Sequence, residues 1–227
     1  MRREPDFGAL SAKCVEQYDA ANYSKGMAGY VMRRGHEILD KTAAYDTTSS
    51  IIEIGAGSGI HLSFVQRPFR RYVLTDGSDD MLAHARVRHA GRHGVEFQKE
   101  DAANLAAADS SFDRLIATHV LEHLSEPHRV LSEWNRVVRP GGTISLILPC
   151  DPGFAWRLGR HFGPRARSER AGLPYDYFSA REHINPILNL TAFIDYYFDH
   201  VVSVWWPLRI PSSDMNLLYI AHIKVTT

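Results

Sequence analysis

The fold is best predicted from the segment Ile51-Ile-Glu-Ile-Gly-Ala-Gly-Ser-Gly59. Its first four residues have the composition of a buried strand, and its three glycines indicate a tight turn after that strand. Gly55 permits the turn, Gly57 lets a ligand approach the backbone closely, and Gly59 lets a following helix pack on the strand. The segment is not a P-loop, because no Gly-Lys-Ser/Thr sequence completes it. A glycine-rich turn can also be purely structural, so other residues must decide its role.

A second predicted strand, Tyr72-Val-Leu-Thr-Asp76, ends in a carboxylate. At the carboxyl end of strand two, an acidic residue can accept hydrogen bonds from both hydroxyls of a bound ribose. The alternative role for Asp76 is a helix cap, but Ser78 and the two aspartates after it can cap the next helix themselves. We therefore predict that Asp76 binds a ribose.

The chain from residue 51 onward alternates short apolar runs with longer amphipathic segments. Near-continuous apolar strands that alternate with helices predict an α/β fold with a doubly wound, mostly parallel sheet. Residues 1–45 are predicted to form an N-terminal helical cap and residues 46–227 the main domain. Residues 150–190 lack clear periodicity and are predicted to form an irregular insertion that serves as a lid or binding wall. The predicted strands are 51–54, 72–75, 95–97, 113–118, 143–148, 201–206 and 217–225, and the predicted helices include 78–89, 126–138 and 191–198.

The composition argues against several classes of protein. The 227 residues include 26 Lys+Arg and 26 Asp+Glu, and this balance argues against a protein whose main task is to bind nucleic acid. Two cysteines cannot form a disulfide framework, which favours a reducing, cytoplasmic location. The first residues do not resemble a signal peptide, and the longest apolar runs, such as 144–148, are much shorter than a membrane span.

Four motifs, taken in order, resemble a class I S-adenosylmethionine-dependent methyltransferase of the group that includes the ubiquinone and menaquinone biosynthesis enzymes. The motifs are Glu53-Ile-Gly-Ala-Gly-Ser-Gly59, Asp76-Gly-Ser-Asp-Asp-Met-Leu82, Glu100-Asp-Ala102 with Ser111-Phe-Asp113, and Leu121-Glu-His-Leu124 with Arg139-Pro-Gly-Gly142. Each motif is weak alone, but their order and spacing over roughly residues 50–150 are specific. Asp101 argues against a nicotinamide enzyme, because this family places an aspartate beside the adenine amino group and nicotinamide dehydrogenases have no such fixed element.

The resemblance implies a Rossmann-like sheet of seven strands, in which the last strand is antiparallel and inserted between strands five and six. It also implies that S-adenosylmethionine lies across the carboxyl ends of strands one, two and four. Met81 is explained equally well as part of the helix core. Tyr18 and Tyr23 of the N-terminal segment are expected to fold over the cofactor. The other residues implied in cofactor binding are Glu53, Gly55, Ala56, Gly57, Gly59, Asp76, Gly77, Asp101, Ala102 and His119.

Methyl transfer requires alignment of the reactants, exclusion of water and, where the acceptor carries a proton, a base. The candidate bases are His119, His123 and His183, although His123 can equally serve to shape its loop. Tyr175, Tyr177 and His183 are candidates for the acceptor pocket. We therefore predict methyl transfer to an O or N atom of a small-molecule acceptor. The alternatives are an NAD-dependent oxidoreductase and a catalytically silent nucleotide-cofactor binder on the same fold.

Two further patterns need an interpretation. His119-Val-Leu-Glu-His123 matches a metalloprotease motif, but a predicted strand runs directly into it and Pro127 follows, so we predict no metal site. Residues 154–170 contain five arginines and Glu169, interleaved with aromatic residues. This segment is either a solvated surface or a site for an anionic group such as a phosphate, a carboxylate or a lipid headgroup. In the second case, it would serve a lipid or anionic acceptor, or peripheral contact with a membrane.

Overall fold

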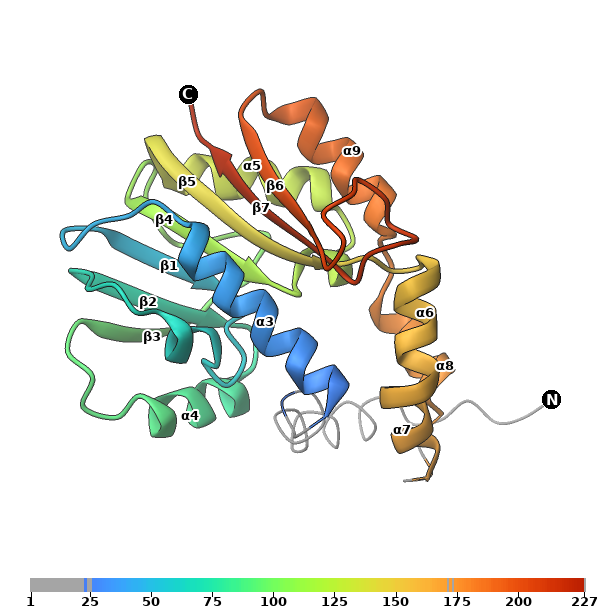
Figure 1. Cartoon of the computed structure of the whole chain (residues 1–227). Helices are drawn as coiled ribbons and strands as arrows, with labels where there is room; N and C mark the ends of the chain where they lie inside the picture. The colour runs from blue at the N-terminus through green and yellow to red at the C-terminus, as the bar shows by residue number, and fades with distance from the viewer. Residues whose placement is uncertain (1–22, 24–25, 171, 173, 227) are drawn as a thin grey trace.

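The computed structural model describes residue 23, residues 26–170, residue 172 and residues 174–226. A seven-stranded sheet with the order β3-β2-β1-β4-β5-β7-β6 forms its centre (Figure 1). The first five strands pair in parallel, whereas β7 is antiparallel to both β5 and β6. The predicted mostly parallel sheet with an inserted antiparallel last strand is therefore confirmed. The strands are β1 (Ser50–Ile54), β2 (Arg71–Asp76), β3 (Val95–Lys99), β4 (Phe112–Thr118), β5 (Val138–Pro149), β6 (Val201–Trp206) and β7 (Leu218–Lys224).

Helices cover both faces of the sheet. Figure 1 shows α3 across one face, with α5 and α9 on the other. Alternate residues of β1 explain this arrangement, because successive side chains of a strand point to opposite faces. Ile51 joins the apolar cluster that includes Leu39 of α3, and Ile52 joins the cluster that includes Trp134 of α5. The α-helices are α3 (Met27–Thr42), α4 (Asp79–Arg88), α5 (Pro127–Val137), α6 (Phe154–Arg160), α7 (Ala166–Arg170), α8 (Tyr175–Glu182) and α9 (Ile187–Tyr197).

Three short helical turns complete the architecture: the 3-10 turns η1 (His61–Phe64) and η2 (Leu121–His123), and the π turn η3 (His161–Arg165). The helix expected after Gly59 is the single 3-10 turn η1. Among the described residues, no helix has both the length and the apolar character needed to cross a bilayer.

The prediction of an irregular segment at 150–190 is wrong, because most of this segment is helical. It forms α6, η3, α7 and α8. The first three of these elements bury no residue, and α8 buries Ser179. Apolar periodicity marks a helix by its buried stripe. A helix without such a stripe gives no periodic signal, which explains why the sequence did not reveal these helices.

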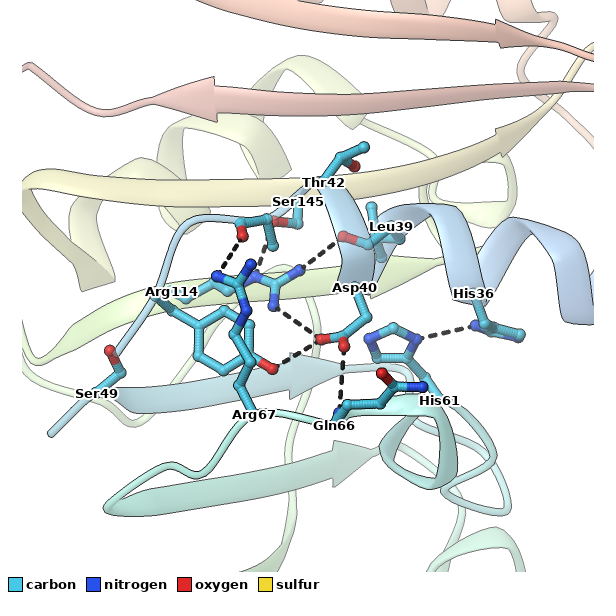
Figure 2. Close-up of polar contacts among 12 residues, drawn as sticks. His36, Leu39, Asp40, Thr42, Ser49, His61, Gln66, Arg67, Arg114 and Ser145 are labelled. Atoms are coloured by element: carbon cyan, nitrogen blue, oxygen red, sulfur yellow. Dashed lines mark hydrogen bonds and ion pairs between the residues drawn. The ribbon is translucent and has the colours of Figure 1, made fainter. Parts of the chain in front are cut away.

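A buried polar cluster fastens α3 to the sheet. Figure 2 shows Arg114, in the middle of β4, with contacts to α3 and to Ser145 of β5. Arg114 is fully buried; its Nε donates to Ser145 Oγ (3.0 Å), and its Nη1 lies 3.8 Å from Asp40 Oδ1 on α3. The guanidinium also lies 4.9 Å from the centre of the Tyr45 ring, whose hydroxyl donates to Asp40. Since a buried arginine requires a compensating charge, Asp40 couples α3 to β4. The predicted boundary at residue 45 stays a prediction.

Candidate active site

The glycine loop after β1 adopts a conformation that favours glycine. Gly55 and Gly57 have φ of +59° and +55°, in the left-handed region. A Cβ at Gly55 would lie 2.5 Å from Cγ2 of Val120, whereas a Cβ at Gly57 would meet nothing within 4 Å. The loop therefore touches the segment after β4 on one side and leaves Gly57 facing open space.

The loops after β1, β2 and β3 meet around Asp76. One carboxylate oxygen of Asp76 accepts from the backbone N–H of Gly57 (2.8 Å), and the other accepts from that of Ser78 (2.8 Å). The Asp76 carbonyl accepts from the backbone N–H of Glu100 (3.2 Å), at the end of β3. Ser78 Oγ accepts from the Met81 N–H and caps α4, so Asp76 is not that cap. Each carboxylate oxygen has a second lone pair for a ligand hydroxyl. The ribose role of Asp76 stays a prediction.

Several other predicted cofactor residues lie at the same edge of the sheet. A Cβ at Gly77 would lie 3.9 Å from the Glu100 carbonyl, so the β2 and β3 loops are neighbours there. Asp101 is exposed and accepts from the backbone N–H of Ala103 (2.9 Å). Ala102 is half-buried, and its carbonyl accepts from the indole of Trp134 (2.9 Å). Their contacts with an adenine stay predictions.

Three more of the predicted residues, Ala56, Gly59 and Met81, lie in the segments that follow β1 and β2. Ala56 is buried, and its N–H donates to the Thr75 carbonyl (2.8 Å). The ring of His89, at the end of α4, donates through Nε2 to the Gly59 carbonyl (2.7 Å). Met81 is only 7% exposed, which agrees with its reading as helix core and leaves contact with an adenine a prediction.

Glu53 has a different environment from the other predicted cofactor residues. Its side chain is 1% exposed, and one carboxylate oxygen accepts from the Tyr72 hydroxyl (2.7 Å). Burial raises the pKa of Glu53 to about 8, against the lowering effects of Tyr72 and Arg114. The Glu53 carboxyl therefore lies beside the buried polar cluster around Arg114. Its contact with a cofactor stays a prediction.

Tyr23 connects the N-terminal segment to the glycine loop through two histidines, while Tyr18 lies outside the described residues. The Tyr23 hydroxyl lies 2.8 Å from His36 Nε2, and His36 Nδ1 lies 3.0 Å from Nδ1 of His61, two residues after Gly59. Both histidines are fully buried, and burial lowers the pKa of His36 to about 3. Tyr23 is therefore held near the loop by neutral rings. Its predicted closure over the cofactor is not tested by this arrangement.

The turn after β4 carries a buried carboxylate between two histidines. Glu122 is 1% exposed; its Oε1 lies 3.6 Å from His119 Nδ1 and 3.9 Å from His123 Nε2. Within the described part of the chain, neither carboxylate oxygen of Glu122 has a hydrogen-bond partner, nor has the buried Nε2 of His119. Burial pushes the pKa of Glu122 upward, but the neighbouring histidines bring it below its ordinary value. The turn therefore holds an anion beside two potential bases.

The third predicted base, His183, lies against this turn. The rings of His123 and His183 are 5.0 Å apart in an edge-to-face arrangement. His123 Nδ1 donates to the Glu182 carbonyl (2.8 Å), and His183 Nδ1 lies 2.9 Å from Asp151 Oδ2. The structure therefore brings His119, His123 and His183 together, although they come from the end of β4 and the end of α8.

Asp151 is a site residue that the sequence did not reveal, whereas Arg160 was predicted only as one of the arginines of the segment 154–170. The Arg160 guanidinium lies 3.0 Å from the same oxygen of Asp151 that contacts His183. Burial would raise the pKa of Asp151, but the His183 bond and the charge of Arg160 keep it below its ordinary value. One signal was available: Asp151 comes two residues after the end of β5, at the same edge where β1, β2 and β4 end. Glu122 stands in the metal-like motif and in the fourth family motif, but neither motif gave it a role.

The predicted acceptor-pocket tyrosines differ in their surroundings. Tyr175 is half-buried, with its ring 5.3 Å from the Arg160 guanidinium, so it adjoins the cluster around Asp151. The Tyr177 hydroxyl accepts from Arg181 (3.3 Å) on the same helix. The roles of both residues toward an acceptor stay predictions.

The metalloprotease-like motif 119–123 lies on the end of β4 and the short η2 turn rather than on a long helix. Across the residues that the structure describes, no group of three His, Cys, Asp or Glu side chains has an arrangement that could hold a metal ion.

Comparison with known proteins finds methyltransferases that are similar to this chain. Residues 52–146 match a family model described as a methyltransferase domain. A demethylmenaquinone methyltransferase from Clavibacter sepedonicus is 37% identical over 112 residues, which is 49% of this chain and 40% of that protein. The chain carries an S-adenosylmethionine-dependent methyltransferase domain. A phosphatidylethanolamine N-methyltransferase from Cereibacter sphaeroides is 33% identical to it over 126 residues, 53% of this chain and 57% of that protein.

Solved structures share the fold of this methyltransferase domain. Phosphoethanolamine N-methyltransferase 2 of Haemonchus contortus, solved with S-adenosyl-L-methionine, matches with a TM-score of 0.67 at 15% identity. The match covers 93% of this chain and 57% of that one. This chain spans about half the length of the first curated relatives that it matches.

The residues of the domain fit the family's cofactor, S-adenosylmethionine, on two observations. The open side of Gly57 leaves room for a ligand against the backbone, and the buried His119 Nε2 has no hydrogen-bond partner among the described residues. Asp76 would hold the ribose, Asp101 would read the adenine, and the glycine loop would lie along the methionine and ribose portions.

Proposed function

We propose that the protein transfers a methyl group from S-adenosylmethionine to an oxygen or nitrogen atom of a small-molecule acceptor, with His183 as the base. The observation that carries this proposal is the Asp151–His183 pair (2.9 Å) packed against the His119–His123 turn. That turn includes Val120, whose side chain lies against the glycine loop at Gly55. The potential base and the cofactor loop therefore adjoin at one edge of the sheet.

The side chains around Asp151 define how His183 would act. An ionised carboxylate only accepts hydrogen bonds, so Asp151 fixes the proton of His183 on Nδ1 and leaves Nε2 free to take a proton from the acceptor. S-adenosylmethionine, when bound, supplies a methyl group on a positively charged sulfur. A hydroxyl acceptor would pass its proton to Nε2 of His183 as its oxygen takes the methyl group, whereas a protonated amine would pass its proton to Nε2 before the nitrogen attacks; S-adenosylhomocysteine would be the leaving group in both cases.

A lipid or anionic acceptor has two supports. Arg160 contacts Asp151 and also lines an adjoining surface cavity of about 520 Å³, so a cationic group borders the proposed base. One relative is named for N-methylation of phosphatidylethanolamine, a lipid amine. The protonated amine of such an acceptor must lose a proton before it attacks, which is the step assigned to His183.

The test is an assay of S-adenosylhomocysteine release with three acceptors: phosphatidylethanolamine in vesicles, a 1,4-naphthoquinol and a simple phenol. The variants are His183→Gln and Asp151→Asn, with His93→Gln, an exposed histidine between α4 and β3, as the matched control. Loss of a general base lowers kcat by roughly 10²- to 10⁴-fold. We expect that loss for His183→Gln, a smaller loss for Asp151→Asn, and no loss for His93→Gln.

The result divides the alternatives. Unchanged kcat in His183→Gln would refute the base assignment while leaving methyl transfer intact. S-adenosylhomocysteine binding without turnover of any acceptor would favour the catalytically silent binder. Binding of NAD in preference to S-adenosylhomocysteine would favour the oxidoreductase alternative.

A further inference from the structure

Helix α6 and the π turn η3 expose a row of large apolar side chains. Phe154, Leu158 and Phe162 are 59%, 48% and 76% exposed. They recur at every fourth position, so they lie along one side of a continuous helical segment. Neither α6 nor η3 buries any residue. Exposed apolar groups of this size, gathered on one element, indicate a surface that contacts something else.

A neighbouring loop extends the apolar surface. Leu208, Ile210 and Met215 are 52%, 47% and 47% exposed. Asp214 of this loop accepts from the backbone N–H groups of Phe154 and Ala155, at 2.9 Å each, which fixes the loop at the start of α6. The apolar surface therefore belongs to two segments that are held together.

The same segment is strongly cationic. Residues 154–170 contain five arginines and a single acid, Glu169. Three of the arginines line the 520 Å³ surface cavity together with Phe154, Leu158 and Asp176. Of these three, Arg160 pairs with Asp151 and Arg165 pairs with Glu169 and Asp176, while Arg157 is exposed. Cationic and apolar side chains thus border one hollow on the protein surface. Figure 1 shows α6 and α7 at one end of the sheet, beyond the end of β5.

We propose that this surface, defined by residues 154–170 (α6, η3 and α7) and the loop 207–217, docks on a lipid bilayer that contains anionic lipids. The phenyl and leucine side chains would enter the interfacial region, while the arginine heads would stay at the level of the phosphates. A soluble anion would use the arginines but would leave Phe162 without a role. A bilayer accepts both kinds of side chain without requiring a surface of matching shape, so it is the occupant that accounts for all of them.

The test is flotation of the full chain with vesicles of phosphatidylcholine, with and without phosphatidylglycerol. We expect binding to the anionic vesicles, weak binding to the neutral ones, and release as salt screens the surface charge. Arg157→Gln with Arg170→Gln should weaken binding roughly 30-fold, and Phe154→Ser with Phe162→Ser at least about tenfold. Equal binding to both kinds of vesicle, or to neither, would overturn the proposal.

Matched variants elsewhere on the surface test whether vesicle binding depends on this surface or only on the overall charge and hydrophobicity of the protein. Arg34→Gln with Arg129→Gln removes two surface arginines from α3 and α5. Val87→Ser with Tyr196→Ser removes two side chains that are 80% and 82% exposed on α4 and α9. Both controls should bind anionic vesicles like the unchanged protein. A loss of vesicle binding equal to that of the variants in residues 154–170 would refute the assignment.

Inorganic phosphate, compared with chloride at equal ionic strength, distinguishes a bilayer from a soluble anion. Release of the protein by phosphate alone would show a site for a free anion and overturn the docking proposal. All variants should bind S-adenosylhomocysteine with unchanged affinity by calorimetry, which shows that they are folded. Vesicle binding is measured without methyl transfer, so this proposal can fail or hold independently of the proposed function.

Discussion

Replacing Gly57 by alanine should abolish most cofactor binding at little cost to the fold. Gly57 has φ of +55°, and a Cβ added there would meet nothing within 4 Å. Gly91, in the loop between α4 and β3, has φ of +73° and an equally open Cβ position. The two sites therefore impose the same backbone strain on alanine, but only Gly57 belongs to the cofactor loop.

The size of the stability effect follows from this strain. An L-residue in the left-handed region costs about 1–2 kcal/mol. For a chain of this length, that cost corresponds to a fall in Tm of about 2–8 °C. Gly57→Ala and Gly91→Ala should both show it. Gly55→Ala should cost more, because its Cβ would also lie 2.5 Å from Val120 Cγ2.

The binding effect should separate the two variants. At Gly57 the new methyl group would occupy the space that a ligand needs beside the backbone, and overpacking of this kind costs about 1–3 kcal/mol. Affinity for S-adenosylhomocysteine should therefore fall roughly 5- to 150-fold in Gly57→Ala and stay unchanged in Gly91→Ala. The assays are isothermal calorimetry and urea unfolding. Equal affinity in the two variants, with equal loss of stability, would refute the assignment of the loop as the cofactor surface.

Three further predictions concern the polar groups. Asp76→Asn should weaken S-adenosylhomocysteine binding at least about tenfold by calorimetry, because it removes a charged acceptor for the ribose hydroxyls; unchanged affinity would contradict the ribose role. Arg114→Met should lower the free energy of unfolding by about 3–5 kcal/mol in urea, because Asp40 is left buried and uncompensated. Adding Asp40→Asn should recover part of that loss, and simple additivity of the two losses would argue against the pairing. Stability should also fall as the pH drops from 6.5 toward 4, since burial lowers the pKa of His36 to about 3 and of His222 to about 4, while the unfolded chain binds these protons near pH 6.5. Glu53 acts in the opposite sense, because burial raises its pKa to about 8. Between pH 4.5 and 8 the folded protein holds a proton that the unfolded chain has lost, so the contribution of Glu53 to stability grows as the pH falls. Urea unfolding of the unchanged protein and of His36→Gln at pH 6.5 and 4.5 should give a shallower pH dependence for the variant, and equal slopes would contradict the assignment.

The local pattern of the sequence was sufficient to predict the sheet and the position of the glycine loop. A buried parallel strand is a continuous apolar run, and β1, β2 and β4 all lie within a residue or two of their predicted bounds. The glycine spacing likewise belongs to the chain itself, because only glycine adopts the backbone at Gly55 and Gly57 without strain. These features depend on neighbours in sequence, so they can be read without a structure.

The tertiary structure alone decided which polar groups act together. Asp151 and His183 are 32 residues apart, and the turn that holds Glu122 comes from a third segment. Their meeting depends on how the chain between β5 and α9 folds back over the sheet edge. The helices of that stretch bury almost no side chain, so no apolar period marks them. Glu53 shows the same limit: its motif did not indicate that its carboxylate accepts a hydrogen bond from Tyr72, which lies on the neighbouring strand. Pairings across the fold are set by packing, and packing is not a local property of the chain.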